Sequence, residues 1–147
     1  MKNWGWAVLL VLVICIVWWS KFGFHIGSPA LNCLYADADK KVETICVDKL
    51  KDNSLISNPL KITGRARGTW FFEASFPIQL LDQNGAALAQ TIGQTPSDWM
   101  TNDLIPFTAE LKFVAPAGNT GQLVLHKDNP SGLPEHDASF SIPIRFR

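Results

Sequence analysis

The side chains best suited to chemistry gather around one loop near the C-terminus. Imidazole and carboxylate groups lie close together there: His126, Asp128, Glu135, His136 and Asp137. Such nitrogen and oxygen ligands could hold Zn²⁺ or Ca²⁺ if the loop brought them together. The stretch Asp128–Gly132 departs from the calcium-loop pattern at its third position. The favoured interpretation is therefore a structural loop without a metal, organised by Asx and Ser turns. Its structural residues would be Lys127, Asp128, Asn129 and Ser131.

Other patterns that would indicate catalysis are weak. The sequence has no Gly-x-Ser-x-Gly elbow, which an α/β-hydrolase nucleophile needs. Gly64 and Gly68 lack the Lys-Ser/Thr of a phosphate-binding loop. Glu73 and Asp98 are the only acids that we consider as a glycosidase pair. We therefore expect no catalytic residues, no cofactor and no enzyme activity; a small metal-dependent hydrolase is the least favoured alternative.

Two arginines could bind a partner. Arg65 and Arg67 are two residues apart, so they share one face of an extended chain and could grip a phosphate or an acidic group. A solvated strand face, or ion pairs with Glu73 and Asp98, would explain the same pattern. We keep both arginines as candidate binding residues.

Aromatic side chains supply the other binding candidates. Trp70, Phe71 and Phe72 are consecutive, so they cannot all point inward from a strand. An exposed aromatic beside arginines is typical of interface hot spots, although core packing explains most such residues. Trp99 and Met100 could plug one end of the domain or form a recognition tip. The candidates are Trp70, Phe71, Trp99 and Met100.

The cysteines indicate the redox compartment. Cys15 lies in an apolar run, which leaves Cys33 and Cys46 as a pair in the polar part. A disulfide between them would close a short loop, worth about 3 kcal/mol in the chain-entropy model. Disulfides persist outside the cytoplasm, so the pair predicts export. Two unrelated reduced thiols are the alternative.

These candidate residues must be positioned by strands, because hydrophobic residues recur with a period of two. The alternation runs through Trp70, Phe72, Ala74, Phe76, Ile78 and Leu80, which predicts one long strand. Asn84-Gly85 then predicts a type I′ hairpin turn, which needs positive φ at both residues. A last strand alternates Phe140, Ile142, Ile144 and Phe146 with polar residues.

Six or seven short strands at about ten-residue spacing predict a sandwich or a barrel. Pro77 and Pro143 cannot donate ladder hydrogen bonds, so each marks an edge or a bulge. Exposed edges favour an open sandwich. We therefore expect an all-β, immunoglobulin-like antiparallel β-sandwich of about seven strands, preceded by a single N-terminal transmembrane or signal segment.

The N-terminal segment has an uninterrupted apolar run from Trp6 to Trp19, flanked by Lys2 and Lys21. Its length fits the apolar core of a cleaved signal. Tryptophans at both ends are typical of a membrane anchor, and extension past Lys21 would lengthen the run. A retained anchor is favoured, with cleavage near Ser28–Ala30 as the alternative. Either route exports the rest of the chain.

The charge balance excludes one class of partner. Without Lys2 and Lys21, eleven basic residues stand against thirteen acidic ones. Nucleic-acid binders need a clustered excess of Lys and Arg, so no nucleic-acid partner is expected. The exported part is long enough for one domain of about 100 residues.

Five segments carry a resemblance to a known family. They are Gly64–Gly68, Trp70–Glu73, Phe76-Pro77, Asp98–Thr101 and Lys127–Gly132. In this order they resemble the immunoglobulin-like domain that accompanies the bacterial spore-germination GerMN domain. The resemblance runs from about Ser54 to the C-terminus, and the chain has no GerMN domain. It implies a bacterial, membrane-tethered, exocytoplasmic β-sandwich without known chemistry.

Together these observations divide the chain into three parts: a signal anchor at residues 1–26, a charged spacer with a disulfide at 27–53, which could hold a short helix or hairpin, and the sandwich at 54–147. The expected function is non-catalytic binding or structural support in the cell envelope.

The expected location is the inner (cytoplasmic) membrane, with secretion or periplasmic release after cleavage as the alternative. The partner would be an envelope protein or a glycan. An accessory subunit that pairs through a sheet edge is the second hypothesis.

Overall fold

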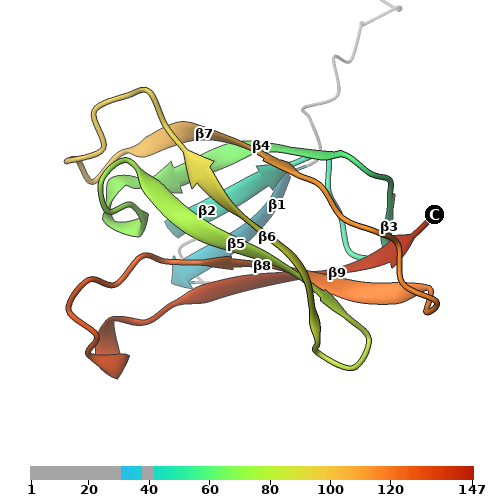
Figure 1. The fold of residues 1–147 in the computed structure, drawn as a ribbon. Coiled ribbons are helices and arrows are strands. Elements are labelled where there is room, and N and C mark those ends of the chain that lie inside the picture. The colour runs from blue at the N-terminus through green and yellow to red at the C-terminus, as the bar shows by residue number, and fades with distance from the viewer. Residues whose placement is uncertain (1–30, 38–41) are drawn as a thin grey trace, which may run out of the picture.

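The structure is a computed structural model that describes residues 31–37 and 42–147, which form nine β-strands and two short 3₁₀ helices (Figure 1). The strands are β1 (Leu31–Asp37), β2 (Val42–Asp48), β3 (Ser54–Ile56), β4 (Leu60–Arg67), β5 (Ser75–Asp82), β6 (Ala87–Gln94), β7 (Leu104–Leu111), β8 (Thr120–His126) and β9 (Ser139–Phe146). The 3₁₀ helices are η1 (Gly68–Trp70) and η2 (Pro134–His136). The expectation of an all-β domain is confirmed.

The described strands form one continuous sheet in the order β1-β2-β4-β7-β6-β5-β8-β9-β3. This differs from the expected antiparallel sandwich of about seven strands in strand number and in one strand direction, because β3 runs parallel to β9. The sheet curls into two facing layers, and β6 joins β7 through the single pair Gln94–Thr108. The layers therefore remain connected along one flank, like a half-barrel.

The core lies between the two layers and follows the predicted alternation. Burial along β4 and β9 alternates strictly over most of each strand, as an amphipathic strand with one core face requires. The expected inward residues of the last strand, Phe140, Ile142, Ile144 and Phe146, are all buried. The largest fully buried side chains are Trp70, Phe76, Phe107, Ile45, Ile62, Ile78, Leu80, Leu111, Leu123, Leu125, Ile142 and Ile144.

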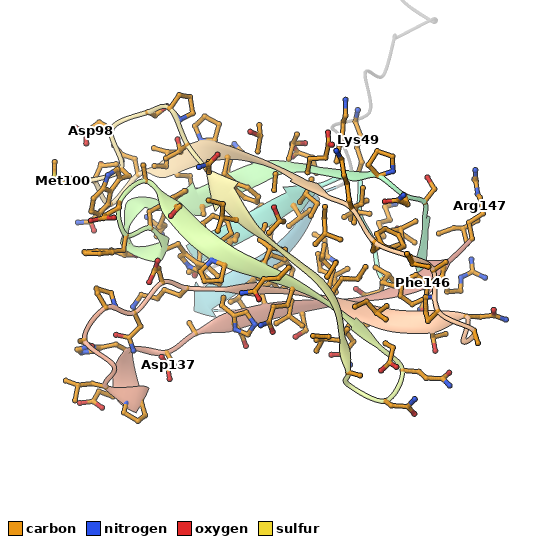
Figure 2. The ribbon with its side chains drawn as sticks, in the orientation of Figure 1. Lys49, Asp98, Met100, Asp137, Phe146 and Arg147 are labelled. Atoms are coloured by element: carbon orange, nitrogen blue, oxygen red, sulfur yellow. A yellow bond between two sulfur atoms is a disulfide. The ribbon has the colours of Figure 1, made fainter. Side chains whose placement is uncertain are left out.

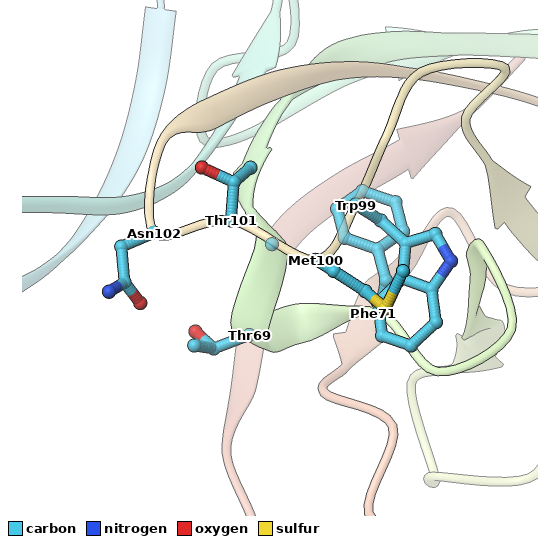
Figure 3. Close-up of a pocket in the computed structure, with 7 residues that line it drawn as sticks. Thr69, Phe71, Trp99, Met100, Thr101 and Asn102 are labelled. Carbon is cyan, nitrogen blue, oxygen red and sulfur yellow. The ribbon is translucent and has the colours of Figure 1, made fainter.

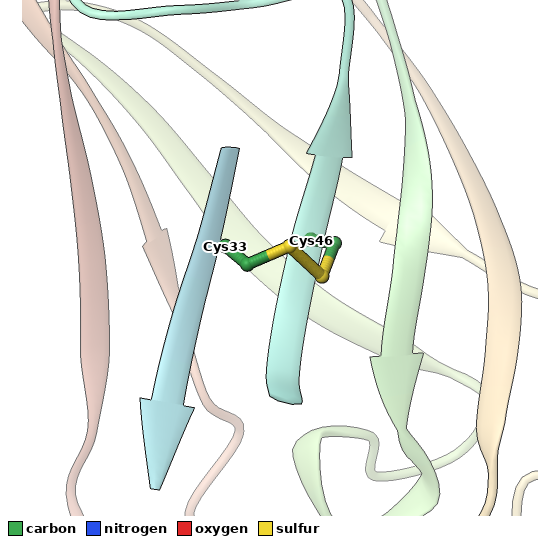
Figure 4. Close-up of a disulfide and its surroundings, with 2 residues drawn as sticks. All are labelled: Cys33 and Cys46. Atoms are coloured by element: carbon green, nitrogen blue, oxygen red, sulfur yellow. A yellow bond between two sulfur atoms is a disulfide. The ribbon is translucent and has the colours of Figure 1, made fainter. Parts of the chain in front are cut away.

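The segment expected to be a charged spacer contributes two strands to this sheet. β1 pairs with β2, and β2 pairs with β4 through residues 45–47. The expected disulfide is present: Cys33 and Cys46 lie directly opposite each other on β1 and β2, with their Cα atoms 4.1 Å apart (Figure 4). Cys46 points away from the core, since its strand neighbours Ile45 and Val47 are core residues.

The hairpin predicted at Asn84-Gly85 is present between β5 and β6, but its turn differs from type I′. Gly85 has φ of +82°, whereas Asn84 is not among the described non-glycine residues with positive φ. The Asp82 carboxylate stabilises this turn instead. Its Oδ1 accepts hydrogen bonds from the backbone N–H of Asn84 and of Ala86, both at 2.8 Å. An Asx turn therefore shapes this loop.

The prolines lie where a neighbouring strand stops. Pro77 pairs with Ile92 of β6, but the pairing of β5 with β8 begins only at Ile78. Pro143 lies just before the segment of β9 that pairs with β3, and its carbonyl accepts a hydrogen bond from the Asn53 N–H. Proline has no backbone N–H to donate, and at both positions no ladder bond is lost because no strand pairs on that side.

The predicted anchor at residues 1–26 lies outside the described residues. Within residues 31–37 and 42–147, we find no helix with the length and apolarity needed to cross a membrane.

Candidate functional site

Three loops meet at one end of the sheet, which we call the loop end. They are η1 with the turn that follows it (68–75), the β6–β7 loop (95–103) and the β8–β9 loop (127–138). Figure 2 shows Asp98, Met100 and Asp137 at this end, and Lys49, Phe146 and Arg147 at the opposite end. The loop end contains most of the residues predicted to bind a partner.

The long strand predicted through Trp70 and Phe76 is wrong, because the chain turns twice in this region. β4 ends at Arg67 and η1 follows, with the Phe71 N–H donating to the Gly68 carbonyl at 3.1 Å. A tight turn then places both Glu73 and Ala74 at positive φ, +49° and +60°. Backbone hydrogen bonds in both directions between Phe72 and Ser75 close this turn.

These turns change which aromatic residues are exposed. Trp70 and Phe71 are buried, and each packs edge-on against Phe76. Phe72 is instead 40% exposed and meets Trp99 edge-on, with ring centroids 6.4 Å apart. Two of the predicted binding residues are thus mainly core residues, and the exposed aromatic is one that we did not choose. The turn at Glu73 and Ala74 has no glycine to signal it.

The loop at 95–103 is held against η1 by backbone contacts. The Gly68 N–H donates to the Asp103 carbonyl at 3.2 Å. A Cβ at Gly68 would lie 2.0 Å from the Thr101 carbonyl oxygen and 2.1 Å from that of Trp99. Only glycine therefore fits at this close approach.

Side chains fix the same loop. The Arg67 guanidinium donates to the Asn102 carbonyl at 2.6 Å, and Asp98 Oδ1 accepts from the Met100 N–H at 3.0 Å. The acids considered as a glycosidase pair thus have local roles: Asp98 caps the loop, and Glu73 lies in the turn.

A shallow pocket of about 270 Å³ lies between these elements, lined by Gly68, Thr69, Phe71, Trp99, Met100, Thr101 and Asn102 (Figure 3). Met100 is 77% exposed, and Trp99 is half-buried against the core. Small-molecule pockets usually measure about 300–1,000 Å³. This pocket therefore has room for a single side chain or a single sugar ring.

The two candidate arginines lie on the same outward face of β4, as predicted from their spacing. Arg65 is exposed and lies opposite Cys46 of β2, whereas Arg67 is partly buried and its guanidinium contacts the 95–103 loop. Arg65 is therefore the arginine that a partner can reach more easily.

The third loop is held together by side-chain hydrogen bonds of Asn129 and Ser131, two of the residues that we expected to shape it. The Asn129 amide donates to the Leu133 carbonyl at 2.8 Å and to Asp137 Oδ1 at 2.7 Å. The Ser131 hydroxyl donates to Asn129 Oδ1 at 2.5 Å and lies 3.1 Å from His136 Nδ1. Asn129 and Ser131 thus bond to each other and to residues further along the same loop.

The other two residues of this predicted loop tie it to the rest of the domain. The Lys127 ammonium donates to the His136 carbonyl at 3.0 Å, and the Asp128 N–H donates to the Trp70 carbonyl at 3.0 Å. The latter bond joins the loop to η1. Among the residues that the structure describes, no three His, Cys, Asp or Glu side chains are grouped as metal ligands would be.

Comparison with known families gives one match. Residues 45–133, more than half of the chain, match the immunoglobulin-like domain of bacterial spore germination. Searches among curated proteins and solved structures gave no match. The matched range includes two loops of the loop end in full, together with residues 127–133 of the third. The chain therefore belongs to the family of immunoglobulin-like domains of bacterial spore germination.

Proposed function

We propose that this chain is a non-catalytic module of the bacterial cell envelope. Its N-terminal segment would tether it to the cytoplasmic membrane, and its immunoglobulin-like domain would lie on the exocytoplasmic side. There it would bind an envelope protein or a glycan through the loop end. No cofactor and no nucleic acid takes part in this proposal.

The observation that carries the proposal is the convergence of the family-resembling segments. Gly68, Asp98–Thr101, Trp70–Glu73 and Lys127–Gly132 meet at one end of the sheet. Gly68 packs closely against the carbonyls of Trp99 and Thr101, and the Asp128 N–H donates to the Trp70 carbonyl. Loops gathered at one end of a rigid sandwich are where immunoglobulin-like domains bind ligands. The surface there includes Phe72, Trp99 and Met100, residue types enriched at interfaces.

The direction of the chain supports the same arrangement. β1 begins at Leu31, opposite Asp48, and β4 runs from there toward the loop end at Arg67. The first described residue, Leu31, therefore lies away from the loop end, and a tether that precedes it would join the domain on that side. On this proposal the pocket would project away from the membrane, where a partner can reach it.

The disulfide supports export. Cys33 and Cys46 are adjacent across β1 and β2, and structural disulfides are rare in the cytoplasm. Cleavage of the N-terminal segment would give a secreted or periplasmic form of the same module. The mass of the mature chain, measured after purification from its host, distinguishes the two forms.

Affinity capture with paired variants tests the proposal. The tagged full-length chain is cross-linked in cells and purified from detergent-solubilised envelopes, and the recovered partner is quantified. Met100→Asp and Arg65→Glu should each reduce recovery at least tenfold, because Met100 is exposed at the loop end and Arg65 is exposed on β4 close to it. Val114→Asp is the matched control, since Val114 is 86% exposed at the opposite end. Equal recovery with all three variants would overturn the assignment of the loop end.

A second candidate function is pairing through a sheet edge, and the structure of β9 favours it. The Pro143 carbonyl points away from β8 toward β3. Strand geometry therefore directs the backbone groups of Ser139 and Ser141 to the same side, beyond the three residues of β9 that β3 covers. An added strand could pair there. A photo-reactive residue at Ser141 should then cross-link to one envelope protein, whereas one at Thr108 should not.

A further inference from the structure

The two ends of the domain carry opposite charge. The three loops of the loop end contain six acidic residues and one basic residue: Glu73, Asp98, Asp103, Asp128, Glu135, Asp137 and Lys127. The opposite end, where β2, β5, β7 and β9 end, we call the tether end; it consists of residues 48–53, 82–86, 112–119 and 145–147. It contains five basic and three acidic residues: Lys49, Lys51, Lys112, Arg145, Arg147, Asp48, Asp52 and Asp82. Figure 2 shows Asp98 and Asp137 at the negative end and Lys49 and Arg147 at the positive one.

Hydrogen bonds fix the loop that carries Lys49 and Lys51. The Lys51 N–H donates to the Ser54 hydroxyl at 2.9 Å. The Asn53 N–H donates to the Pro143 carbonyl at 2.8 Å. Arg145 Nε donates to the Asn53 carbonyl at 3.0 Å, which joins this loop to β9. The basic residues of two separate segments are therefore held side by side.

Most cations of the tether end are available to an anionic ligand. Four of them are exposed and form no ion pair with a carboxylate in the described part of the chain: Lys49, Lys51, Arg145 and Arg147. The two nearby acids are bonded to neutral groups instead. Asp48 Oδ2 accepts from the Thr63 hydroxyl at 3.0 Å, and Asp52 Oδ1 accepts from the Asn32 amide at 3.1 Å.

The proposed tether would bring this end of the domain to the membrane. Leu31 pairs with Asp48, so the chain enters the domain beside the loop of Lys49 and Lys51. With residues 1–26 as the anchor, only residues 27–30 separate it from Leu31. An extended chain spans at most about 3.6 Å per residue, so Leu31 would lie within about 18 Å of the end of the anchor. The headgroup layer occupies about 5–7 Å of this distance.

The loop end would lie much farther from the membrane. β4 runs between the two ends and has eight residues, which correspond to about 26 Å at the usual rise of a strand. Electrostatic attraction to a charged surface falls off over a Debye length of about 8–10 Å in physiological salt. The membrane would therefore attract the cations of the tether end, while the acidic loop end would lie outside this range.

We propose that the tether end docks on the membrane by binding the phosphate groups of anionic lipids. The inference rests on the proposed tether and adds a ligand and an orientation to it. Lysine and arginine bind phosphate oxygens through charge-assisted hydrogen bonds, and basic clusters beside a membrane segment are attracted to anionic lipids. Leu55 is 50% exposed and lies opposite Arg145, so an apolar side chain accompanies the cations. An acidic protein would suit the same cations, but the short tether brings the membrane to them.

Energy transfer to labelled lipids measures the orientation. The full-length chain is placed in nanodiscs of phosphatidylcholine alone, or of an equal mixture with phosphatidylglycerol, with an acceptor dye on a trace of the headgroups. A fluorescent amino acid replaces either Met100 at the loop end or Ser57, which follows the Ile56 carbonyl that accepts from the Arg147 N–H. The ratio of transfer at Ser57 to transfer at Met100 should be at least twofold higher in the anionic nanodiscs. High salt should abolish this difference.

Two variants of equal charge identify the residues responsible. Lys49→Gln/Lys51→Gln lowers the net charge by two at the tether end, and it should lower the ratio of docked to undocked domains at least tenfold. Gln90→Glu/Thr108→Glu is the matched control, because it lowers the net charge equally at exposed positions in the middle of β6 and β7. This variant should give the transfer ratio of the wild type. Circular dichroism verifies that both variants are folded.

The outcomes separate docking from the tether itself. A chain that co-elutes with the nanodiscs but gives the same transfer ratio in neutral and anionic lipid would overturn docking and leave the tether intact. A chain that elutes without the nanodiscs would overturn both. An equal loss of docking in the control variant would also overturn the proposal, because net charge rather than the tether end would then explain the effect.

Discussion

The ring of Phe107 on β7 lies directly against Gly64 on β4. The two residues are cross-strand partners, and a Cβ at Gly64 would lie 2.8 Å from the ring and 2.1 Å from the Cys46 carbonyl oxygen. Gly93 lies in the same way beneath the ring of its partner Phe76. Glycines beneath aromatic rings thus recur in both layers, where they let large core side chains lie close to the backbone.

Gly64→Ala should destabilise the domain by about 2 kcal/mol or more. The added methyl group overlaps a backbone oxygen and a fully buried ring, and overpacking of this kind costs about 1–3 kcal/mol. Urea unfolding of the purified chain measures the change. Gly118→Ala is the control, because its Cβ meets only the end of the flexible Gln83 side chain, so its effect should stay within about 0.5 kcal/mol.

Ala74→Gly should stabilise the domain by about 1 kcal/mol. Ala74 has φ of +60°, a left-handed conformation that costs a residue with a Cβ about 1–2 kcal/mol. Glycine removes that cost. Part of the gain is offset, because glycine has more conformational freedom than alanine in the unfolded chain. The thermal unfolding midpoint should rise by several degrees. Ala117→Gly, at a loop position without positive φ, should lower it; an unchanged or lower midpoint for Ala74→Gly would contradict the turn geometry.

Removal of the disulfide should lower the free energy of unfolding by about 3 kcal/mol. This is the contribution expected from the loop-closure entropy of the unfolded chain for a loop of this length. Cys33 and Cys46 are 13 residues apart. The double variant Cys33→Ala/Cys46→Ala should therefore resemble the wild type measured with reductant. Mass spectrometry after alkylation without reductant should find both thiols unmodified in wild type purified from an oxidising compartment. Alkylation of both would show that the bridge does not form there.

Asn129→Ala should loosen the β8–β9 loop and leave the sheet intact. The change removes two hydrogen bonds donated by the amide and the one accepted from Ser131, each worth about 1 kcal/mol. Hydrogen exchange should accelerate at least tenfold between residues 128 and 138 and remain unchanged in β5. Asn119→Ala, whose backbone carbonyl rather than its side chain bonds to Phe146, serves as the control.

The fold was largely predictable where a strand has one core face. Phe140, Ile142, Ile144 and Phe146 alternate with polar residues, and hydrophobic burial determines their direction. The alternation of hydrophobic and polar residues could not reveal β3, because three residues are too few to show a period of two. It also could not reveal that charge-rich residues before Ser54 form strands, since an edge strand such as β1 needs few buried side chains.

The candidate site was less predictable than the fold. Ser turns are local, and the Ser131 hydroxyl accepts a hydrogen bond from the Leu133 N–H at 3.3 Å as such a turn requires. Asn129 instead donates its amide to Leu133 and Asp137, bonds that turn propensity alone does not predict. The exposure of Phe72 depends instead on a turn at Glu73-Ala74, two residue types that rarely adopt positive φ. The contact of Phe72 with Trp99 joins residues from separate loops. Only the folded chain brings these residues together.

The narrow junction between β6 and β7 has a mechanical consequence. It consists of one ladder pair, Gln94–Thr108, and a hydrogen bond from the Thr91 hydroxyl to the Glu110 carbonyl. One flank of the domain is closed by this junction, whereas the flank between β1 and β3 has no ladder in the described sheet order. When the domain fluctuates open, the two layers should therefore separate at the β1–β3 flank and rotate about the β6–β7 junction. Water would reach the interior first along the side of β1. The disulfide there joins adjacent strands of one layer, so it would hold the edge strand β1 in place without restraining the separation of the layers.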